Sequence, residues 1–166
     1  MSDAGNTAGW SRSLRALASS KASIVVNAAG VEVPLHIDDD AAALLAGTDA
    51  AATVRLYLLL EQVRGTLDAT VLQIYLRHPD PARSGQHGAL FMGSIALYGL
   101  RRATSASPDR GMVCILDISA HDTVLRPAIA RGDTQFELYV RPHPPLQTGT
   151  SIDIGRIGIC IEPRQP

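Results

Sequence analysis

The sequence is poor in cysteine and in aromatic residues. Its 166 residues include two cysteines, four tyrosines, two phenylalanines and one tryptophan. Cys114 and Cys160 are too few and too far apart for the disulfide framework of a small secreted domain. Both lie in apolar runs, which predicts buried free thiols. So few aromatic side chains also argue against an extended platform for stacking nucleic-acid bases.

The chain also lacks an excess of charge and any long apolar run. Fifteen basic and 16 acidic residues give a formal net charge of −1, which argues against the basic face of a nucleic-acid-binding protein. No apolar run approaches the roughly 18 residues of a membrane-spanning helix. Arg12 and Arg15 interrupt the N-terminal segment where a secretory signal needs an apolar stretch. We therefore expect a cytoplasmic protein without membrane contact, with export in complex with a partner as the alternative.

The five histidines show none of the spacings of a metal site. No H-x-x-x-H, H-E-x-x-H or C-x-x-C motif occurs. His78 and His87 flank a loop that could bring them together, but two imidazoles alone are an incomplete ligand set. The acidic run Asp38–Asp40 lacks the spaced partners and the glycine of a calcium loop. The sequence predicts no metal or cofactor in this chain, with His78 and His87 as its weak metal candidates.

Motifs for redox chemistry and nucleophilic catalysis are missing too. A blue-copper site needs a cysteine followed by a histidine and a methionine, and neither cysteine has these neighbours. Ser119, His121 and Asp122 are close in sequence, but neighbours on a strand point to opposite faces and cannot form a triad by adjacency. We expect Ser119 and Asp122 to cap a helical turn instead. No G-x-S-x-G motif or glycine-rich phosphate loop occurs. We predict that the chain is not an enzyme.

What the sequence has in abundance is alternation of apolar and polar residues. In the run VEVPLHI (31–37), every second residue is apolar and shares one face. The runs VRLYLLLE (54–61) and FELYVR (136–141) repeat this pattern. Such alternation is typical of a half-buried strand. Further strands are expected in the runs SIVVN (23–27), TVLQIYLR (70–77), ALFMGSIALYG (89–99), MVCILDI (112–118), TSIDIG (150–155) and RIGICIE (156–162).

These runs predict an all-β fold. About 7–9 short strands, separated by turn residues and by no long amphipathic helix, favour an antiparallel β-sandwich. One or two short helical turns are expected, in HDTVLRPAIARG (121–132) and in the alanine-rich segment 38–52, which is either a surface loop or a single turn. Residues 1–22 are interpreted as an N-terminal arm, helical or disordered. Residues 23–166 are interpreted as a single β-sandwich domain.

The order and the amino-acid sequences of these runs resemble a known family over roughly residues 50–163. The strongest matches are VRLYLLLEQVRG (54–65), LQIYLRHP (72–79), LFMGSIALYGL (90–100), CILDIS (114–119), QFELYVRPHPP (135–145) and IDIGRIGICIE (152–162). They are similar to the C-terminal β-sandwich domain of tyrosinases, polyphenol oxidases and molluscan haemocyanins. Tyr75, Gly93, Ser94 and Gly99 carry much of this resemblance. Gly93 inside a strand also predicts a bulge or a close backbone approach, and Gly99 predicts a turn.

The resemblance implies a companion role. In that family, the sandwich packs over a helical core whose six histidines bind two coppers, and it covers the substrate entrance with an inserted side chain. This sequence contains no such core. The resemblance therefore implies a non-catalytic subunit that shields or matures a separate tyrosinase-like di-copper oxidase, with copper in the partner. The C-x-x-C copper-handling motif of some fungal companion domains is absent, which argues against copper delivery.

The same resemblance directs attention to apolar side chains that could enter a partner's pocket. Leu90, Phe91 and Met92 follow the loop after residue 77 and are the first candidates for partner contact, with Tyr98 and Tyr139 next. The competing interpretation of Leu90–Met92 is the start of a core strand. A second hypothesis for the whole chain is a stand-alone sandwich module that binds itself or an unrelated enzyme through a strand edge. A homo-oligomer or a hetero-oligomer fits either hypothesis.

Overall fold

The computed structural model describes residues 14–46, 54–77 and 89–162. These residues form nine strands and a few short helices. The strands are β1 (Arg15–Ser19), β2 (Ile24–Val26), β3 (Val31–Ile37), β4 (Arg55–Gly65), β5 (Val71–Arg77), β6 (Ala89–Ala96), β7 (Met112–Asp117), β8 (Gln135–His143) and β9 (Ile152–Glu162). The helices are α2 (Ala41–Ala46), α3 (Leu100–Ala106), the 3₁₀ turn η1 (Ser119–His121) and α4 (Asp122–Ala130).

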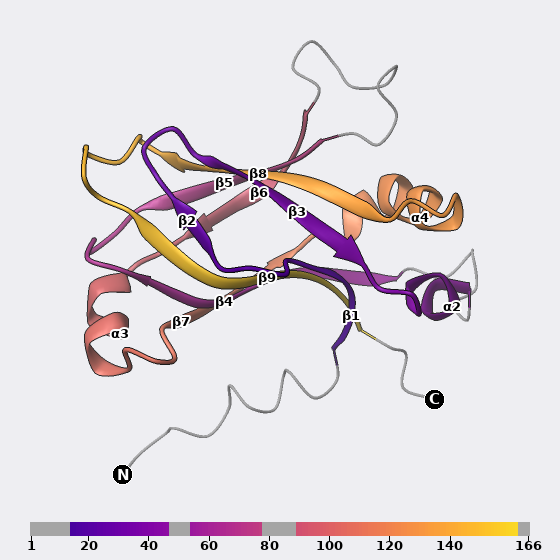
Figure 1. Cartoon of the computed structure of the whole chain (residues 1–166), viewed down its shortest axis with the longest axis horizontal. Helices are drawn as coiled ribbons and strands as arrows, with labels where there is room; N and C mark the ends of the chain where they lie inside the picture. The colour runs from indigo at the N-terminus through magenta and orange to yellow at the C-terminus, as the bar shows by residue number, and fades with distance from the viewer. Residues whose placement is uncertain (1–13, 47–53, 78–88, 163–166) are drawn as a thin grey trace.

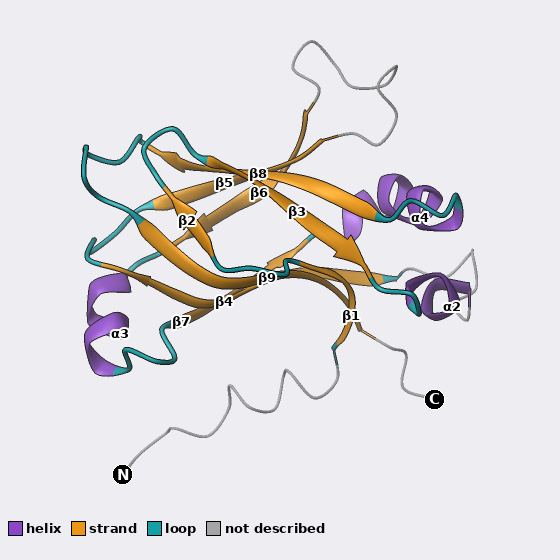
Figure 2. Ribbon diagram, viewed as in Figure 1, coloured by secondary structure: helices purple, strands orange, loops and turns teal. Residues whose placement is uncertain are grey.

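All nine strands belong to one antiparallel sheet that folds over on itself (Figures 1 and 2). Its order is β6-β5-β8-β3-β1-β9-β4-β7, and β2 also pairs with β9. Strands β3, β8, β5 and β6 form one layer, and β9, β4 and β7 form the other. The sheet passes between the layers where β1 pairs with both β3 and β9. The predicted antiparallel sandwich is therefore confirmed, and its two layers are parts of one nearly closed sheet.

Alternation decides which face of each strand is buried. In β3, Val33 and Leu35 point into the core, while Glu32 and Pro34 are exposed. Strands β5 and β8 follow the same rule, since apolar side chains gain free energy by leaving water. Strand β9 departs from it, because all residues from Ile157 to Ile161 are buried. The core between the layers contains, among others, Leu17, Leu56, Leu58, Leu60, Leu72, Ile74, Leu76, Leu138, Val140, Ile157 and Ile159.

Strand β1 corrects the sequence prediction of an N-terminal arm. Residues 15–19 were expected in a helical or disordered arm, but they pair on both sides and bury Leu17 and Ala18 completely. Leu and Ala have high helix propensity, which made the segment resemble a helix. Burial between β3 and β9 outweighs this local preference. The rest of the expected arm, up to residue 13, lies outside the described residues.

Two further elements differ from the prediction. The runs at 150–155 and 156–162 were expected to be separate strands, but β9 is continuous through Gly155. Gly155 suits this position because a Cβ there would lie 2.2 Å from Oε1 of Gln62 on β4. Helix α3 was not predicted. It begins directly after Gly99, which adopts a positive φ of 74° and forms the predicted turn.

The helices lie at the two ends of the sandwich (Figure 1). Helices α2 and α4 share one end, and α3 lies at the other. Helix α4 confirms the turn predicted at 121–132. Arg126 of α4 donates a hydrogen bond from Nη1 to the carbonyl oxygen of Leu45 in α2, at 3.3 Å, and so joins the two helices. Helix α2 buries Ala41 and Leu45, so the alanine-rich segment contributes to the core.

Gly93 marks the place where the two ends of the sheet approach each other. The register of β5 and β6 shifts between Ile74 and Tyr75, which indicates a bulge beside Gly93. A Cβ on Gly93 would lie 2.9 Å from Cδ2 of Leu116, on β7 of the other layer. Its φ of 151° is also a conformation that side-chain-bearing residues rarely adopt. The predicted bulge is confirmed, and the close neighbour of Gly93 is the Leu116 side chain rather than another backbone segment.

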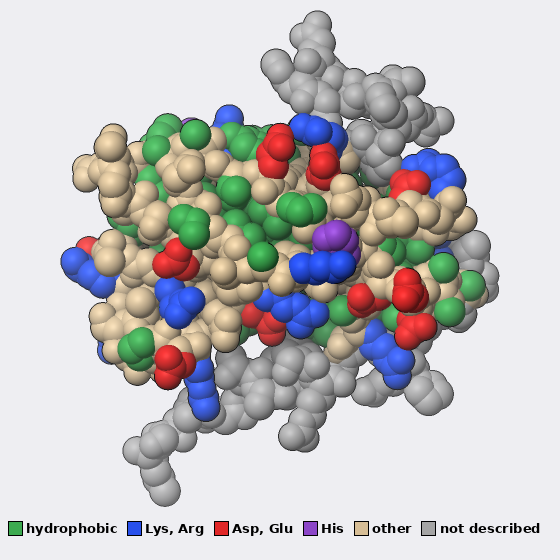
Figure 3. Space-filling view, viewed as in Figure 1, with side chains coloured by type: hydrophobic (Ala, Val, Ile, Leu, Met, Phe, Trp, Pro, Cys, Tyr) green, Lys and Arg blue, Asp and Glu red, His purple; other side chains and the backbone are tan. Residues whose placement is uncertain are grey.

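The face that contains β2 and β3 is partly apolar. Figure 3 shows hydrophobic side chains gathered between these two strands, with charged side chains around them. Val25 of β2 is 54% exposed, and Val31 of β3 is partly buried against the core.

No helix within the described ranges is both long and apolar enough to span a membrane.

Candidate docking surface

Three aromatic side chains form a row across the outer face of β5, β6 and β8. The register places Tyr75 opposite both Phe91 and Tyr139, and residues directly opposite each other share a face of the sheet. The ring centroids of Tyr75 and Phe91 are 5.4 Å apart, and those of Tyr75 and Tyr139 are 6.3 Å apart. Both distances are within the range of favourable aromatic contacts. Phe91 is nevertheless 48% exposed.

Arg141 of β8 fixes the central ring of this row. Its guanidinium carbon lies 5.4 Å from the centroid of the Tyr75 ring, in a cation–π arrangement. Arg141 Nη2 donates hydrogen bonds to Gln73 Oε1 at 2.7 Å and to the Tyr75 hydroxyl at 3.1 Å. The Tyr75 hydroxyl in turn donates to Gln73 Oε1 at 3.2 Å. We call Tyr75, Phe91, Tyr139 and Arg141 the aromatic face.

The turn between β2 and β3 positions the third ring. The Tyr139 hydroxyl donates a hydrogen bond of 2.5 Å to the carbonyl oxygen of Ala29. Gly30 follows with a φ of 85°, and a Cβ at this position would lie 2.7 Å from the carbonyl oxygen of Val140 and 2.9 Å from the Tyr139 hydroxyl. Only glycine fits this conformation and this spacing without displacing its neighbours. Tyr139 is thus held by backbone as well as by its neighbours on the sheet.

A charged rim borders the aromatic face. Arg77 at the end of β5 contacts two carboxylates, Glu32 at 3.0 Å and Glu137 at 2.9 Å. All three side chains are exposed to solvent to a considerable degree, so the pairs add little to the stability of the fold. An apolar centre beside a charged rim is the usual arrangement of a protein–protein interface.

The structure separates the five predicted contact residues. Phe91 and Tyr139 lie in the aromatic face. Leu90 is half-buried and packs against the core. Met92 is only 5% exposed, so its prediction as a contact residue is wrong: alternation along β6 directs it into the core. Tyr98 is 73% exposed but lies in the turn before α3, beyond the opposite end of β6.

The described residues contain no evident metal site. No group of three or more His, Cys, Asp or Glu side chains among them could hold a metal ion. His78 and His87 lie outside the described residues, and so does the loop that was expected to join them. The run Asp38–Asp40 leads through a turn into α2 and lines an open pocket of about 420 Å³ together with Arg15.

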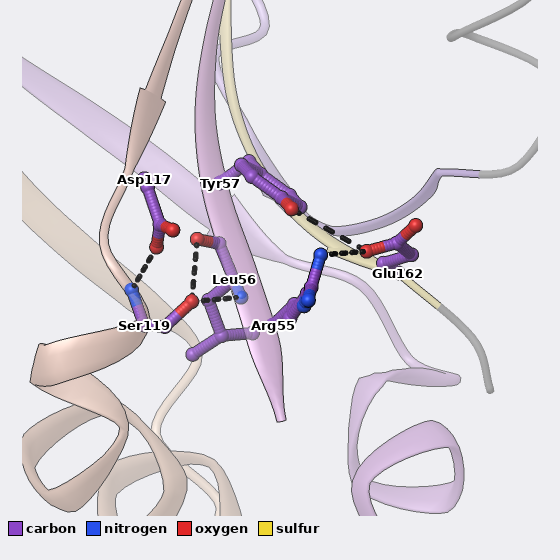
Figure 4. Close-up of polar contacts among 6 residues, drawn as sticks. All are labelled: Arg55, Leu56, Tyr57, Asp117, Ser119 and Glu162. Atoms are coloured by element: carbon purple, nitrogen blue, oxygen red, sulfur yellow. Dashed lines mark hydrogen bonds and ion pairs between the residues drawn. The ribbon is translucent and has the colours of Figure 1, made fainter. Parts of the chain in front are cut away.

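Ser119 has a structural role at the end of β7 (Figure 4). The backbone N–H of Leu56 donates to Ser119 Oγ at 3.0 Å, and this hydroxyl donates to the Leu56 carbonyl oxygen at 3.4 Å. The Ser119 N–H donates to Asp117 Oδ1 at 2.9 Å. Hydrogen bonds from Ser119 are the main reason that the pKa of Asp117 lies below its usual 3.8.

The expected helix caps are therefore wrong. Ser119 and Asp122 make no side-chain cap of η1 or α4. Asp122 instead forms an ion pair with Arg126 at 3.3 Å, one turn along α4. Because the Ser119 hydroxyl bonds to the backbone of β4 and Asp122 pairs with Arg126, these residues do not converge on His121 as a catalytic triad would require.

A second polar cluster occupies the same region. Glu162 at the end of β9 accepts a hydrogen bond from the Tyr57 hydroxyl at 3.4 Å and lies 3.9 Å from Arg55 (Figure 4). These contacts join the ends of β4 and β9. They are long and partly exposed, so they contribute little to the stability of the fold.

Both cysteines are buried and free, as predicted. Burial raises the pKa of Cys114 and of Cys160 to about 11. Both therefore carry neutral thiols near neutral pH, and a thiol without its thiolate is a poor nucleophile and a poor metal ligand.

Comparison with known proteins places the chain in a family. Residues 13–162 match the family described as Domain of unknown function (DUF7868). The chain belongs to the DUF7868 family. The match begins just before β1 and ends with the last residue of β9, so the DUF7868 domain coincides with the folded sheet and includes β1. No curated protein matches the chain.

Sequence reasoning missed two members of the aromatic face in this DUF7868 domain. Tyr75 was recognised as a strand residue and Arg141 as the end of a strand run, but neither was predicted as a contact. The alternation of the sequence did indicate that both side chains are on the outer face, because each occupies a position between buried residues of its strand. Only the register of β5 against β6 and β8, which a single sequence does not specify, brings them beside Phe91.

Proposed function

We propose that this protein is a non-catalytic companion subunit of a tyrosinase-like di-copper oxidase, and that the aromatic face docks on that partner. The observation that carries the proposal is the position of Phe91. This ring is 48% exposed, although it contacts the Tyr75 ring and lies within strand β6. A large apolar side chain held outside the core is a typical anchor for a partner's pocket.

The arrangement around Phe91 supports a binding role. Arg141, Gln73 and Tyr75 hold one another through hydrogen bonds and a cation–π contact. Docking on such a surface orders few additional side chains, and this lowers the entropic cost of association. Tyrosine and arginine are also enriched among residues that contribute most to binding energy. The identity of the partner comes from the resemblance of the sequence to the C-terminal domain of tyrosinases. In this proposal the copper ions belong to that partner alone.

The test is co-expression with a tyrosinase-like di-copper oxidase from the same organism. With an affinity tag on this chain, we expect the oxidase to co-purify, and its copper content or its diphenol oxidation rate to change relative to the oxidase expressed alone. The variant Phe91→Ala should lose about 2 kcal/mol or more of binding energy, which is roughly 30-fold in affinity.

Tyr98→Ala is the matched control, because it truncates a more exposed aromatic residue outside the aromatic face. It should bind like the wild type. A complex that survives Phe91→Ala but not Tyr98→Ala would contradict the assignment of the face. An oxidase that neither co-purifies nor changes in copper content or activity would contradict the companion role itself.

The second candidate is a stand-alone module whose aromatic face binds a protein unrelated to copper oxidases. The same observation favours it, because the position of Phe91 indicates a docking surface without specifying the partner. Phe91-dependent binding to such a protein, together with no binding to the oxidase, would support this candidate over the first.

A further inference from the structure

We propose that a second copy of this chain pairs antiparallel with β7, so that two sheets join into one across a two-fold axis. Strand β7 is the last in the strand order, and within the described part of the chain it pairs with β4 alone. The proposal does not depend on the proposed function, because none of the residues of the aromatic face lies on β7.

The register of β7 shows which of its backbone groups are free. The N–H of Ile118 donates to the carbonyl oxygen of Leu56 at 2.9 Å. Hydrogen-bonded pairs alternate along an antiparallel ladder, so Leu116 and Cys114 also direct their N–H and C=O groups towards β4. The groups of Ile115 and Asp117 consequently point away from β4, at the edge of the sheet. Val113 continues this alternation along β7, opposite the register shift in β4.

The residues with free backbone groups also expose their side chains. Val113 is 49% exposed and Ile115 is 45% exposed. Edge strands are usually protected by lysine, by proline or by a bulge within the strand. The sequence MVCILD contains neither lysine nor proline. The one irregularity in the pairing of β4 and β7 lies opposite Val113, and its extra residue is in β4, between Leu60 and Val63, rather than in β7.

One register makes β7 complementary to itself. With Cys114 on the two-fold axis, Val113 of each copy lies opposite Ile115 of the other, and the free groups of both residues can exchange hydrogen bonds. The two apolar side chains then cover each other on the outer face. In this register, Asp117 of one copy lies opposite Gly111 of the other copy. The neighbour of Gly111 is the exposed Arg110, and Asp109 is one residue before it in the chain. A strand whose own halves match in this way favours a second copy over an unrelated partner.

The first test is the oligomeric state over concentration. Sedimentation velocity from about 1 µM to about 500 µM should show a monomer–dimer equilibrium, because association follows mass action. Ile115→Lys should weaken dimerisation at least about tenfold, since it places a charge in the apolar pair. Val25→Lys is the matched control, because Val25 is equally an exposed strand residue but lies on β2. It should dimerise like the wild type.

The second test uses the unmodified chain and needs no variant to fold. Amide hydrogen exchange should slow for Val113 and Ile115 as the concentration rises. Cys114 and Leu116 should stay protected throughout, because their amides bond to β4. A monomer at all concentrations, a dimer insensitive to Ile115→Lys, or protection of Val113 and Ile115 that does not change with concentration would each overturn the proposal.

Discussion

At Gly93 of β6 the two layers approach each other closely, through Leu116 of β7. The missing side chain of Gly93 leaves room for Leu116, and its φ of 151° suits glycine. Both constraints act on one residue, but they differ in origin: the first is steric and involves a partner, whereas the second belongs to the backbone alone. The steric effect and the backbone effect can therefore be separated by changing Leu116.

We expect Gly93→Ala to lower the free energy of unfolding by about 1–3 kcal/mol through overlap with Leu116 and backbone strain. Leu116→Ala in the same chain should relieve the overlap, so the double variant should lose less than the sum of the two single changes. Urea unfolding of the four proteins measures this coupling. Strictly additive losses would show that Leu116 does not limit the space at Gly93.

The same residue scale explains how much of the candidate site the sequence could predict. The exposed Phe91 and the buried Met92 are neighbours, and alternation alone states that they lie on opposite faces of β6. It does not state which face is covered, because the bulge at Gly93 shifts the register. Phe91 and Met92 were therefore named together as contact candidates, although Phe91 is exposed and Met92 is buried. Contact between Phe91 and a partner stays a prediction, and the position of Arg141 beside Tyr75 could be recognised only from the fold.

At the scale of elements, the side chains of Asp117 and Ser119 accept backbone hydrogen bonds at the end of β7, and neither caps a helix. Asp117 accepts the N–H of Ser119, and Ser119 continues the ladder to Leu56. The pKa of Asp117 is lowered in the folded state, so its stabilising effect is present above its unfolded pKa and is lost as the pH falls through the folded value.

Asp117→Ala should accordingly destabilise the protein at neutral pH, by no more than about 1 kcal/mol because the carboxylate is exposed. The difference from the wild type should shrink as the pH falls below the usual Asp pKa of 3.8. Urea titrations at neutral and at acidic pH provide the comparison. A difference that is constant with pH would show that the carboxylate charge is not involved.

Elements were predicted well where alternation was strong, and poorly where local preference disagreed with the fold. The run at 31–37 became β3 with the same bounds. The segment at 15–19 became a strand despite its helix-forming residues, because β3 and β9 pair with it on both sides. Pairing between residues so distant in sequence leaves no local signal.

At the scale of the whole molecule, the continuous sheet couples the two layers. Leu17 in β1 and Leu72 in β5 are both fully buried, and they belong to different parts of the strand order. Since the hydrogen-bonded order runs without interruption between them, neither layer can be lost without exposing the edge and core of the other.

Leu17→Ala and Leu72→Ala should each cost about 2–5 kcal/mol and shift one common unfolding transition. Far-ultraviolet circular dichroism and tyrosine fluorescence should give the same midpoint for each variant. Two separated transitions would indicate that the layers unfold independently. Leu44→Ala, at a partly buried position of α2, should cost less and serves as the comparison.

Strand β9 sets the timing of folding during synthesis. It is the last strand of the described residues, yet β1, β2 and β4 all bond to it. A chain emerges from the ribosome at about 5–20 residues per second, so these three strands are present for several seconds before their common neighbour. Closure of the sheet must therefore wait until residues 152–162 are made. During that interval the apolar strands of a nascent chain are open to chaperones, and to neighbouring nascent copies of the same protein.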